Sequence, residues 1–116
     1  DLPAERRFPN SLAEAAARET LEETAWQVEP QELVAVYQWC NPQDGAEVVR
    51  FSFAARAVRE LPGLALDAGI ERALWLRRDE LLAQADRLRS PLVLRSLDDY
   101  LAGQRLPLSA LRRVHA

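Results

Sequence analysis

The sequence predicts an α/β fold in which helices lie on both sides of a mixed sheet, an α/β/α sandwich. Three features predict this arrangement: a helical pattern near the N-terminus, two strand-like segments joined by a turn, and two helical patterns that close the chain. With 116 residues and 48% hydrophobic content the chain can bury one core, so we expect residues 1–116 to form a single domain.

The first helix is expected to begin at Ser11, because Ser11 and Glu14 form the S-x-x-E pattern of a capping box. Glu14 can also pair with Arg18 one turn later. A well-started helix is therefore expected to carry the residues that follow.

An antiparallel hairpin is expected next in the chain. Residues 33–39 read as a strand, residues 41–45 as a turn that contains Pro, Asp and Gly, and residues 48–58 as a long strand with alternating side chains. Both strands carry enough apolar residues to belong to a central sheet.

The second half of the chain contains one more strand and two helices. Residues 61–63 break the chain with Pro and Gly, and residues 71–76 read as a strand. A helix is expected at residues 79–85, and another starts with Ser90 as its N-cap and ends at Gly103.

Three carboxylates fall on one face of the first helix. At about 100° per residue, Glu19, Glu22 and Glu23 lie within a narrow arc, opposite the small and apolar side chains. Like charges so close repel one another unless a cation neutralises them, and Mg²⁺ prefers carboxylate oxygens. A metal site is one interpretation, and a solvated acidic face on a surface helix is the other.

The segment around these acids resembles the second half of the Nudix box, written R-E-U-x-E-E-x-G-U with U an aliphatic residue. All four charged positions match, at Arg18, Glu19, Glu22 and Glu23. Ala25 replaces the glycine that lets the chain turn sharply out of the helix. Upstream, where the box reads G-x₅-E-x₇-R, Asn10 stands at the glutamate and Ala4 at the glycine.

The resemblance implies a Nudix-type sandwich that is incomplete at the N-terminus. Members of the family carry one or two strands before the box, whereas this chain begins at Asp1. We therefore expect an N-terminally truncated Nudix hydrolase domain with little or no turnover of its own. The loss of these strands would leave an unpaired sheet edge, which favours a homodimer.

The resemblance also implies an activity, because residues 88–93 and 99–108 are similar to the tail of a subgroup of bacterial Nudix phosphatases. That subgroup removes phosphate from nucleoside di- and triphosphates, thiamine pyrophosphate and its precursor hydroxymethylpyrimidine pyrophosphate. The expected partner is therefore a small-molecule diphosphate. The alternative is a Nudix-fold domain that has lost catalysis and serves as a binding or structural module, which the changes at Asn10 and Ala25 favour.

The same resemblance suggests roles for the site residues. It makes Glu22 and Glu23 ligands of Mg²⁺, with Mn²⁺ as a substitute, and Glu19 a further ligand or the base that positions water. Arg18 would orient the carboxylates, unless it serves only to pair with Glu14. Two further candidates lie on the substrate side of the site. Arg50 could reach a phosphate from the long strand, and Glu71, at the head of the next strand, is equally well explained as a solvated acid.

Composition excludes several other classes of protein. The net charge of −3 argues against non-specific nucleic-acid binding, which needs a basic surface. The single Cys40 cannot form an internal disulfide, and no apolar run is long enough for a membrane span or a signal sequence. We therefore expect a cytoplasmic enzyme domain that contacts neither nucleic acid nor membrane.

Overall fold

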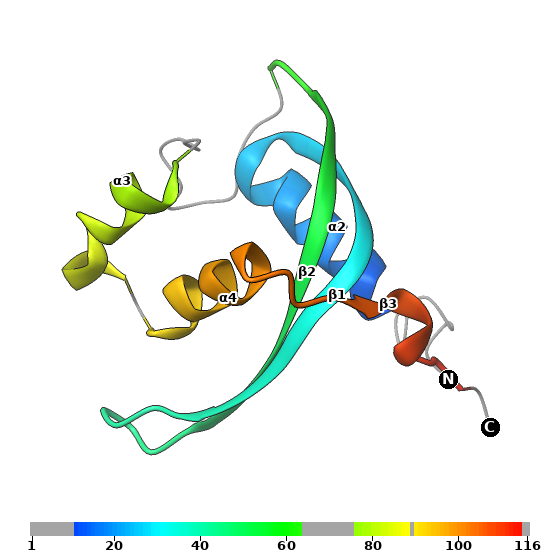
Figure 1. Ribbon diagram of the computed structural model, residues 1–116. Coiled ribbons are helices and arrows are strands. Elements are labelled where there is room, and N and C mark those ends of the chain that lie inside the picture. The colour runs from blue at the N-terminus through cyan, green and yellow to red at the C-terminus, as the bar shows by residue number, and fades with distance from the viewer. Residues whose placement is uncertain (1–10, 64–75, 89, 115–116) are drawn as a thin grey trace.

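The computed structural model describes residues 11–63, 76–88 and 90–114. These residues form a long, curved hairpin with helices beside it and a short third strand near the C-terminus (Figure 1). The helices and strands, in chain order, are α2 (Leu12–Thr24), β1 (Trp26–Cys40), β2 (Glu47–Glu60), α3 (Arg78–Leu82), α4 (Leu92–Leu101) and β3 (Leu106–Pro107), with 3₁₀ turns η1 (Ala85–Arg87) and η2 (Leu108–Ala110).

The described sheet has three strands in the order β2-β1-β3, and both pairings are antiparallel. The hairpin turn between β1 and β2 is closed by a hydrogen bond from the Asn41 N–H to the Ala46 carbonyl, at 2.8 Å. Gly45 takes a positive φ of 72° there, a conformation that suits glycine. The hairpin predicted from the sequence is confirmed, while the further strand predicted at 71–76 lies, except for its last residue, outside the described residues.

Strand β1 begins at Trp26, seven residues before the start predicted from the sequence. Pro30 argues against a strand at this point in the sequence, because proline cannot donate a hydrogen bond to a neighbouring strand. The structure accommodates Pro30 at an irregularity in the pairing with β2, between Pro30 and Glu32. In the structure, half-buried and exposed residues alternate over 26–32, as expected of a strand.

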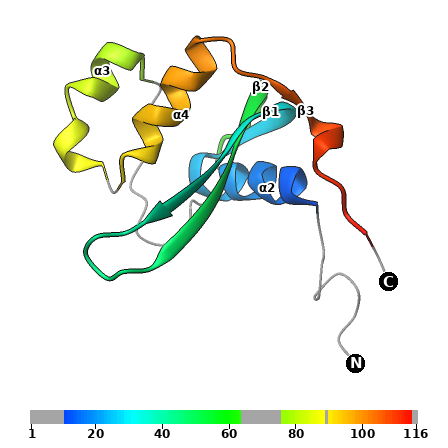
Figure 2. The same ribbon diagram turned by 60° about the horizontal axis from the view of Figure 1, so that its bottom comes forward.

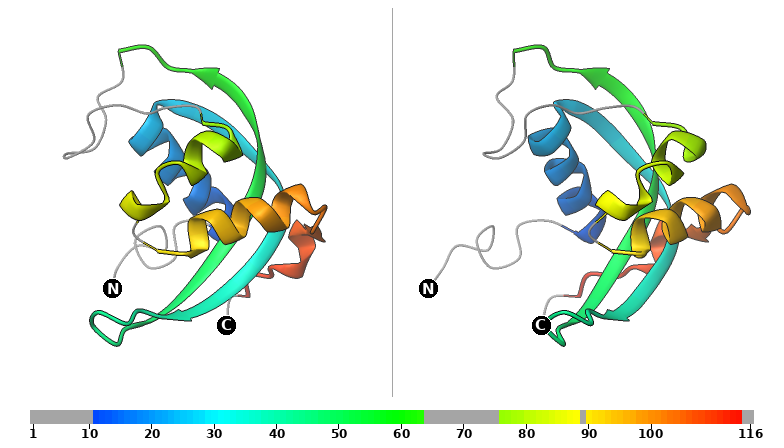
Figure 3. Two further views of the ribbon diagram at one scale, coloured as in Figure 1. Left: turned by 60° about the vertical axis from the view of Figure 1, so that its left-hand side comes forward. Right: turned by 90° about the vertical axis from the view of Figure 1, so that its left-hand side faces the viewer.

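Helices α2 and α4 cover opposite faces of the hairpin (Figures 2 and 3). Neighbouring residues of a strand point to opposite faces, and on β2 the Ser52 hydroxyl bonds Ser96 of α4 while Phe51 lines a cavity with Leu12 of α2. The layered arrangement of helix, sheet and helix predicted from the sequence is therefore confirmed in the described part of the chain.

The core lies where the sheet has strands on both sides of β1. Leu33, only 2% exposed, pairs with Phe53 of β2 and with Leu106 of β3. Val34 next to it is equally buried, and α4 adds Leu92, which is 6% exposed. These are the fully buried hydrophobic residues among those described, so α4 and the central part of β1 form the most tightly packed region.

The C-terminal segment is anchored by one arginine. Arg105 donates to the Tyr100 carbonyl at the end of α4 (2.9 Å), stacks on the Tyr100 ring at 4.0 Å and pairs with Glu32 of β1 at 3.4 Å. Gly103, with φ 88°, turns the chain out of α4 as predicted. The segment between Leu101 and Leu106 therefore has a structural role, because its contacts lead the chain from α4 to β3.

Helix α3 is shorter than the helix predicted at residues 79–85. Helix α3 ends at Leu82, and the residues after it continue as the 3₁₀ turn η1. It is attached to α4 by the Arg78 guanidinium, which donates to both carboxylate oxygens of Asp98 at 2.5 and 3.3 Å. This pair lowers the pKa of the Asp98 carboxyl, chiefly through the hydrogen bond from Arg78.

Candidate functional site

Helix α2 carries the candidate site, and its start is built as the capping-box pattern predicts. The Ser11 hydroxyl accepts a hydrogen bond from the Glu14 backbone N–H at 3.1 Å and donates to the Glu14 carboxylate at 3.2 Å. One of the N–H groups without a helical partner is thus satisfied at the first turn. The helix then runs for thirteen residues to Thr24.

The two sides of α2 differ as the sequence pattern predicts. Its sheet side consists of half-buried small and apolar residues, and Thr20 and Thr24 turn their hydroxyls back to the carbonyls four residues earlier, at 2.8 and 2.6 Å. The opposite side is exposed to solvent and carries the motif residues Arg18, Glu19, Glu22 and Glu23. The hydroxyls are thus satisfied within the helix, while the carboxylates are open to a ligand.

The motif residues are neighbours on the helix surface. Glu19 lies three residues from Glu22 and four from Glu23, a spacing that puts the Cβ atoms about 5–6 Å apart. The Arg18 Nε lies 3.7 Å from the Glu22 Oε1, an ion pair in which both side chains are about half exposed (48% and 47%). This contact fits the predicted role of Arg18 in orienting a carboxylate.

The helix ends in a strained turn at Ala25. Ala25 has φ 63° and ψ 13°, the left-handed conformation that costs about 1–2 kcal/mol for a residue with a Cβ. Among the described residues it is the only non-glycine residue with positive φ. Three hydrogen bonds hold the turn: Ala25 N–H to Leu21 O (2.9 Å), Leu61 N–H to Ala25 O (2.8 Å) and Trp26 N–H to the Thr24 hydroxyl (3.1 Å).

The structure therefore explains why the motif calls for glycine at this position. The sharp exit from α2 sends the chain directly into β1, and the same turn is tied to the end of β2 through Leu61. Alanine adopts the required backbone conformation here only because the surrounding hydrogen bonds impose it.

The remaining predicted residues do not join this group in the part of the chain that the structure describes. Arg50 pairs in register with Tyr37, whose hydroxyl bonds Asp99 of α4, so Arg50 belongs to the α4 face of the sheet. The carboxylates of α2 lie beyond the opposite face, and a contact of Arg50 with the substrate stays a prediction. Glu71 and Asn10 lie outside the described residues.

A polar cluster that the sequence analysis did not single out lies on the α4 face. The Tyr37 hydroxyl donates to Asp99 at 2.5 Å, Arg95 donates to the same carboxylate at 3.3 Å, and Ser52 and Ser96 share a hydrogen bond of 2.6 Å. Burial raises the pKa of Tyr37, and the hydrogen bond to Asp99 raises it further. All of these groups satisfy one another, so we interpret the cluster as structural.

Comparison with known proteins agrees with this fold and motif. The chain matches the NUDIX domain over residues 3–97 and belongs to the Nudix family. It is 41% identical over 101 residues to proteins named Phosphatase NudJ in Escherichia coli strain K12 and in Shigella flexneri, a match that covers 87% of this chain. The chain spans 65% of the length of these relatives.

A solved structure shows the same architecture. A NUDIX hydrolase from Nitrosomonas europaea superposes with a TM-score of 0.87 at 38% sequence identity, covering 90% of this chain and 71% of the other. Among the residues that the structure describes, no helix is long and apolar enough to cross a membrane.

Proposed function

We propose that the protein is a divalent-cation-dependent Nudix hydrolase that cleaves phosphate from small molecules containing a diphosphate. The observation that carries this proposal is the intact motif of Arg18, Glu19, Glu22 and Glu23, which lies on one exposed face of α2. Candidate substrates are nucleoside di- and triphosphates, thiamine pyrophosphate and hydroxymethylpyrimidine pyrophosphate. The similarity to proteins named as phosphatases supports this choice of reaction.

The donor groups on α2 fit a hard cation in chemistry and in number. Within the described residues, no three carboxylate, imidazole or thiol groups are already gathered closely enough to hold a metal ion. Mg²⁺ does not require such a cage, since it is usually bound by one or two carboxylates and completes its shell with water and substrate phosphate. Glu22 and Glu23 are the residues that would hold Mg²⁺, or Mn²⁺ in its place.

The chain's own residues then have distinct roles. Arg18, paired with Glu22 at 3.7 Å, restricts the carboxylate of Glu22 to one side of the helix. Glu19, one turn before Glu22 and Glu23, would add a further oxygen ligand or accept a proton from the attacking water. A bound divalent cation would offset the negative charge on the phosphoryl oxygens and the leaving group.

Calorimetric titration with Mg²⁺ and Mn²⁺ tests the assignment of the metal ligands. Glu22→Gln and Glu23→Gln should each weaken binding by about tenfold or more, because even residues that only support metal ligands contribute that much. Glu14→Gln is the matched control, since it removes an exposed carboxylate from the same helix outside the motif. Equal affinities in all four proteins would rule out the proposed metal site.

Phosphate release tests the reaction itself. The substrates named above would be incubated with the protein, with and without Mg²⁺, beside the Glu22→Gln variant. Release that requires both the cation and Glu22 supports the hydrolase. Because little or no turnover is expected of these 116 residues alone, the decisive form carries restored upstream strands and a glycine-bearing loop that ends in glutamate in place of residues 5–10. If that form binds the metal and still releases no phosphate from any of these compounds, the protein is a binding module.

The binding-module alternative has one structural observation in its favour. Ala25 retains a strained backbone conformation at the position where the family motif has glycine. A change that costs stability at a motif position is expected where selection on the site has relaxed. The tests of metal binding and phosphate release distinguish this alternative from the enzyme.

We also propose a homodimer formed through β2, in a cytoplasmic protein. Among the described strands β2 has a neighbour on one side only, and its Val49 is 59% exposed. A free strand edge pairs readily with a second copy. Sedimentation at several concentrations should show association, and Val49→Lys should reduce it; a monomer at all concentrations would contradict the proposal.

A further inference from the structure

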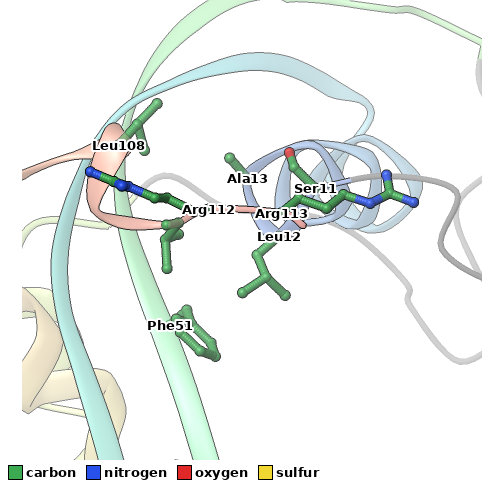
Figure 4. Close-up of a pocket in the computed structure, with 8 residues that line it drawn as sticks. Ser11, Leu12, Ala13, Phe51, Leu108, Arg112 and Arg113 are labelled. Carbon is green, nitrogen blue, oxygen red and sulfur yellow. The ribbon is translucent and has the colours of Figure 1, made fainter. Parts of the chain in front are cut away.

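The two ends of α2 are held in different ways. At its start, the Ser11 hydroxyl caps the first turn, and the side chain of Leu12 extends toward the ring of Phe51 in the cavity that both line (Figure 4). At its end, the helix passes through Ala25 directly into β1. The last turn, which carries two of the proposed metal ligands, therefore depends on how this exit turn is held.

One side chain joins the last turn of the helix to the first residue of the strand. The Thr24 hydroxyl donates to the Thr20 carbonyl at 2.6 Å and accepts from the Trp26 backbone N–H at 3.1 Å. A hydroxyl has one proton to donate and lone pairs to accept, so a single group makes both contacts. Thr24 thus spans Ala25, with one hydrogen bond on the helix side of the turn and one on the strand side.

Alanine at position 25 gives these hydrogen bonds a load to hold. The φ of 63° at Ala25 is accessible to glycine without penalty but is unfavourable for a residue with a Cβ. The strain would be relieved if Ala25 returned to negative φ, which would redirect the chain and unwind the turn before it. The Thr24 hydroxyl opposes this change because its two partners would move apart. The strain of one left-handed alanine is of the same order as the net contribution of one hydrogen bond.

The turn that Thr24 closes is the one that carries Glu22 and Glu23. A helix is least secure at its ends, where the last carbonyls have no partner within the helix. Thr24 is half-buried, whereas the two carboxylates are exposed, so its hydroxyl would act on them through the backbone and not by contact with a cation. Holding the last turn keeps both carboxylates at a constant position relative to Glu19, one turn earlier.

We propose that Thr24 is a positioning residue for the metal site. Its hydroxyl holds Ala25 in the left-handed conformation and thereby fixes the last turn of α2, where Glu22 and Glu23 would bind the cation. This inference rests on the proposed function for the metal itself, whereas the hydrogen bonds that carry it do not involve a ligand.

Hydrogen exchange measured by NMR tests the role of Thr24 in the turn without any metal. The Ala25 amide bonds the Leu21 carbonyl at 2.9 Å, so its exchange rate reports how often the exit turn opens. Thr24→Val keeps the shape of the side chain and removes the hydroxyl, and it should accelerate this exchange by about three- to tenfold. Thr24→Ser restores a hydroxyl and should return the rate close to that of the wild-type protein.

Thr20→Val is the matched control. The Thr20 hydroxyl makes the same kind of bond one turn earlier, to the Ala16 carbonyl at 2.8 Å, and the substitution keeps the Thr20 carbonyl that Thr24 uses. Equal acceleration at Ala25 in both valine variants would overturn the proposal, because the effect would then belong to the helix as a whole.

A double variant locates the defect at the turn. Adding Ala25→Gly to Thr24→Val should restore slow exchange, because glycine adopts the left-handed conformation without help from the hydroxyl. Circular dichroism would verify the fold of each variant. Should Thr24→Val alone fail to fold, folding of the double variant gives the same answer, and failure of both would contradict a role confined to the turn.

Calorimetric titration with Mg²⁺ and Mn²⁺, well below the unfolding temperature, separates positioning of the ligands from stability. Thr24→Val should weaken binding by about threefold or more, and Thr24→Ser and the double variant should recover it, while Thr20→Val should stay within about twofold of the wild-type affinity. Unchanged affinity in Thr24→Val beside a loss in Glu22→Gln would overturn the proposal and leave the proposed function standing. If the wild-type protein binds neither cation, the proposed function fails, and with it the role of Thr24 toward a metal.

Discussion

Helices α2 and α4 lie on opposite faces of one hairpin and use their polar side chains in opposite ways. On α4, Asp99 and Ser96 are engaged with Tyr37 and Ser52 of the sheet, and Leu92 is buried. On α2, no residue is fully buried, and the charged side chains of the motif project into solvent.

We infer from this contrast that the polar side chains of α4 stabilise the fold, whereas the carboxylates of α2 serve ligand binding. The polar groups of α4 are matched by groups of the sheet, so they contribute to specifying how the helix docks. The carboxylates of α2 are not needed to attach the helix, because its sheet side consists of small and apolar residues. Substitutions in α4 should therefore change stability, and substitutions in the motif should change ligand binding.

The largest effect is expected at Leu92. Leu92→Ala should lower the free energy of unfolding by about 2–5 kcal/mol, because it leaves a cavity at a buried position. Leu21→Ala in α2 is the matched change at a half-buried position and should cost less than half as much. Urea unfolding would measure both, and equal costs would mean that the two helices contribute similarly to the core.

The Tyr37–Asp99 hydrogen bond should contribute less. Tyr37→Phe removes the hydroxyl and should destabilise the protein by about 1–2 kcal/mol, while Asp99 keeps its contact with Arg95. Denaturant unfolding at neutral pH checks this value. No change in stability would show that solvent replaces the bond without loss.

The raised pKa of Tyr37 also predicts that the free energy of unfolding depends on pH. The pKa of Tyr37 is raised in the folded protein, so the unfolded chain loses this proton first, near about pH 10. The stability contributed by protonated Tyr37 is complete below that pH and declines as the pH rises through the folded pKa. Unfolding measured from pH 8 to 11 should show the decline, and Tyr37→Phe should make it smaller; an unchanged profile would contradict the raised pKa.

A smaller change, of opposite sign, is expected at the end of α2. Ala25→Gly should stabilise the protein by about 0.5–1 kcal/mol, because relief of the left-handed strain exceeds the entropy cost of glycine. Gly103→Ala supplies the reverse test: it has φ 88° and open space around the added Cβ, so only the backbone conformation opposes it. Gly103→Ala should cost about 1 kcal/mol, and a loss of stability in Ala25→Gly would show that Ala25 is not strained.

The smallest effect on stability is expected in the motif. Without metal, Glu22→Gln and Glu23→Gln should each change the free energy of unfolding by no more than about 0.5 kcal/mol, as is usual for exposed positions. Added Mg²⁺ should raise the melting temperature of the wild-type protein and have less effect on either variant. A large loss of stability without metal would assign these glutamates a structural role.

Several features of the protein could be predicted from local sequence alone. The start of α2 at Ser11, the shared face of Glu19, Glu22 and Glu23, and the hairpin turn at 41–45 depend on residues close together in the chain. Capping, helical periodicity and turn preferences act over such short distances. The family motif was visible for the same reason, since its charged residues lie within six consecutive positions.

Only the tertiary structure decided how these pieces meet. The placement of Arg50 on the α4 face, the early start of β1 at Trp26 and the pairing of β3 with Leu33 depend on contacts between distant segments. The cavity that Phe51 lines with Leu12 of α2 is another such feature, because the path of the tail beyond α4 brings Leu108 to its lining. Side-chain type and spacing determine which groups share a helix or strand, whereas the packing of faces determines which groups share a site.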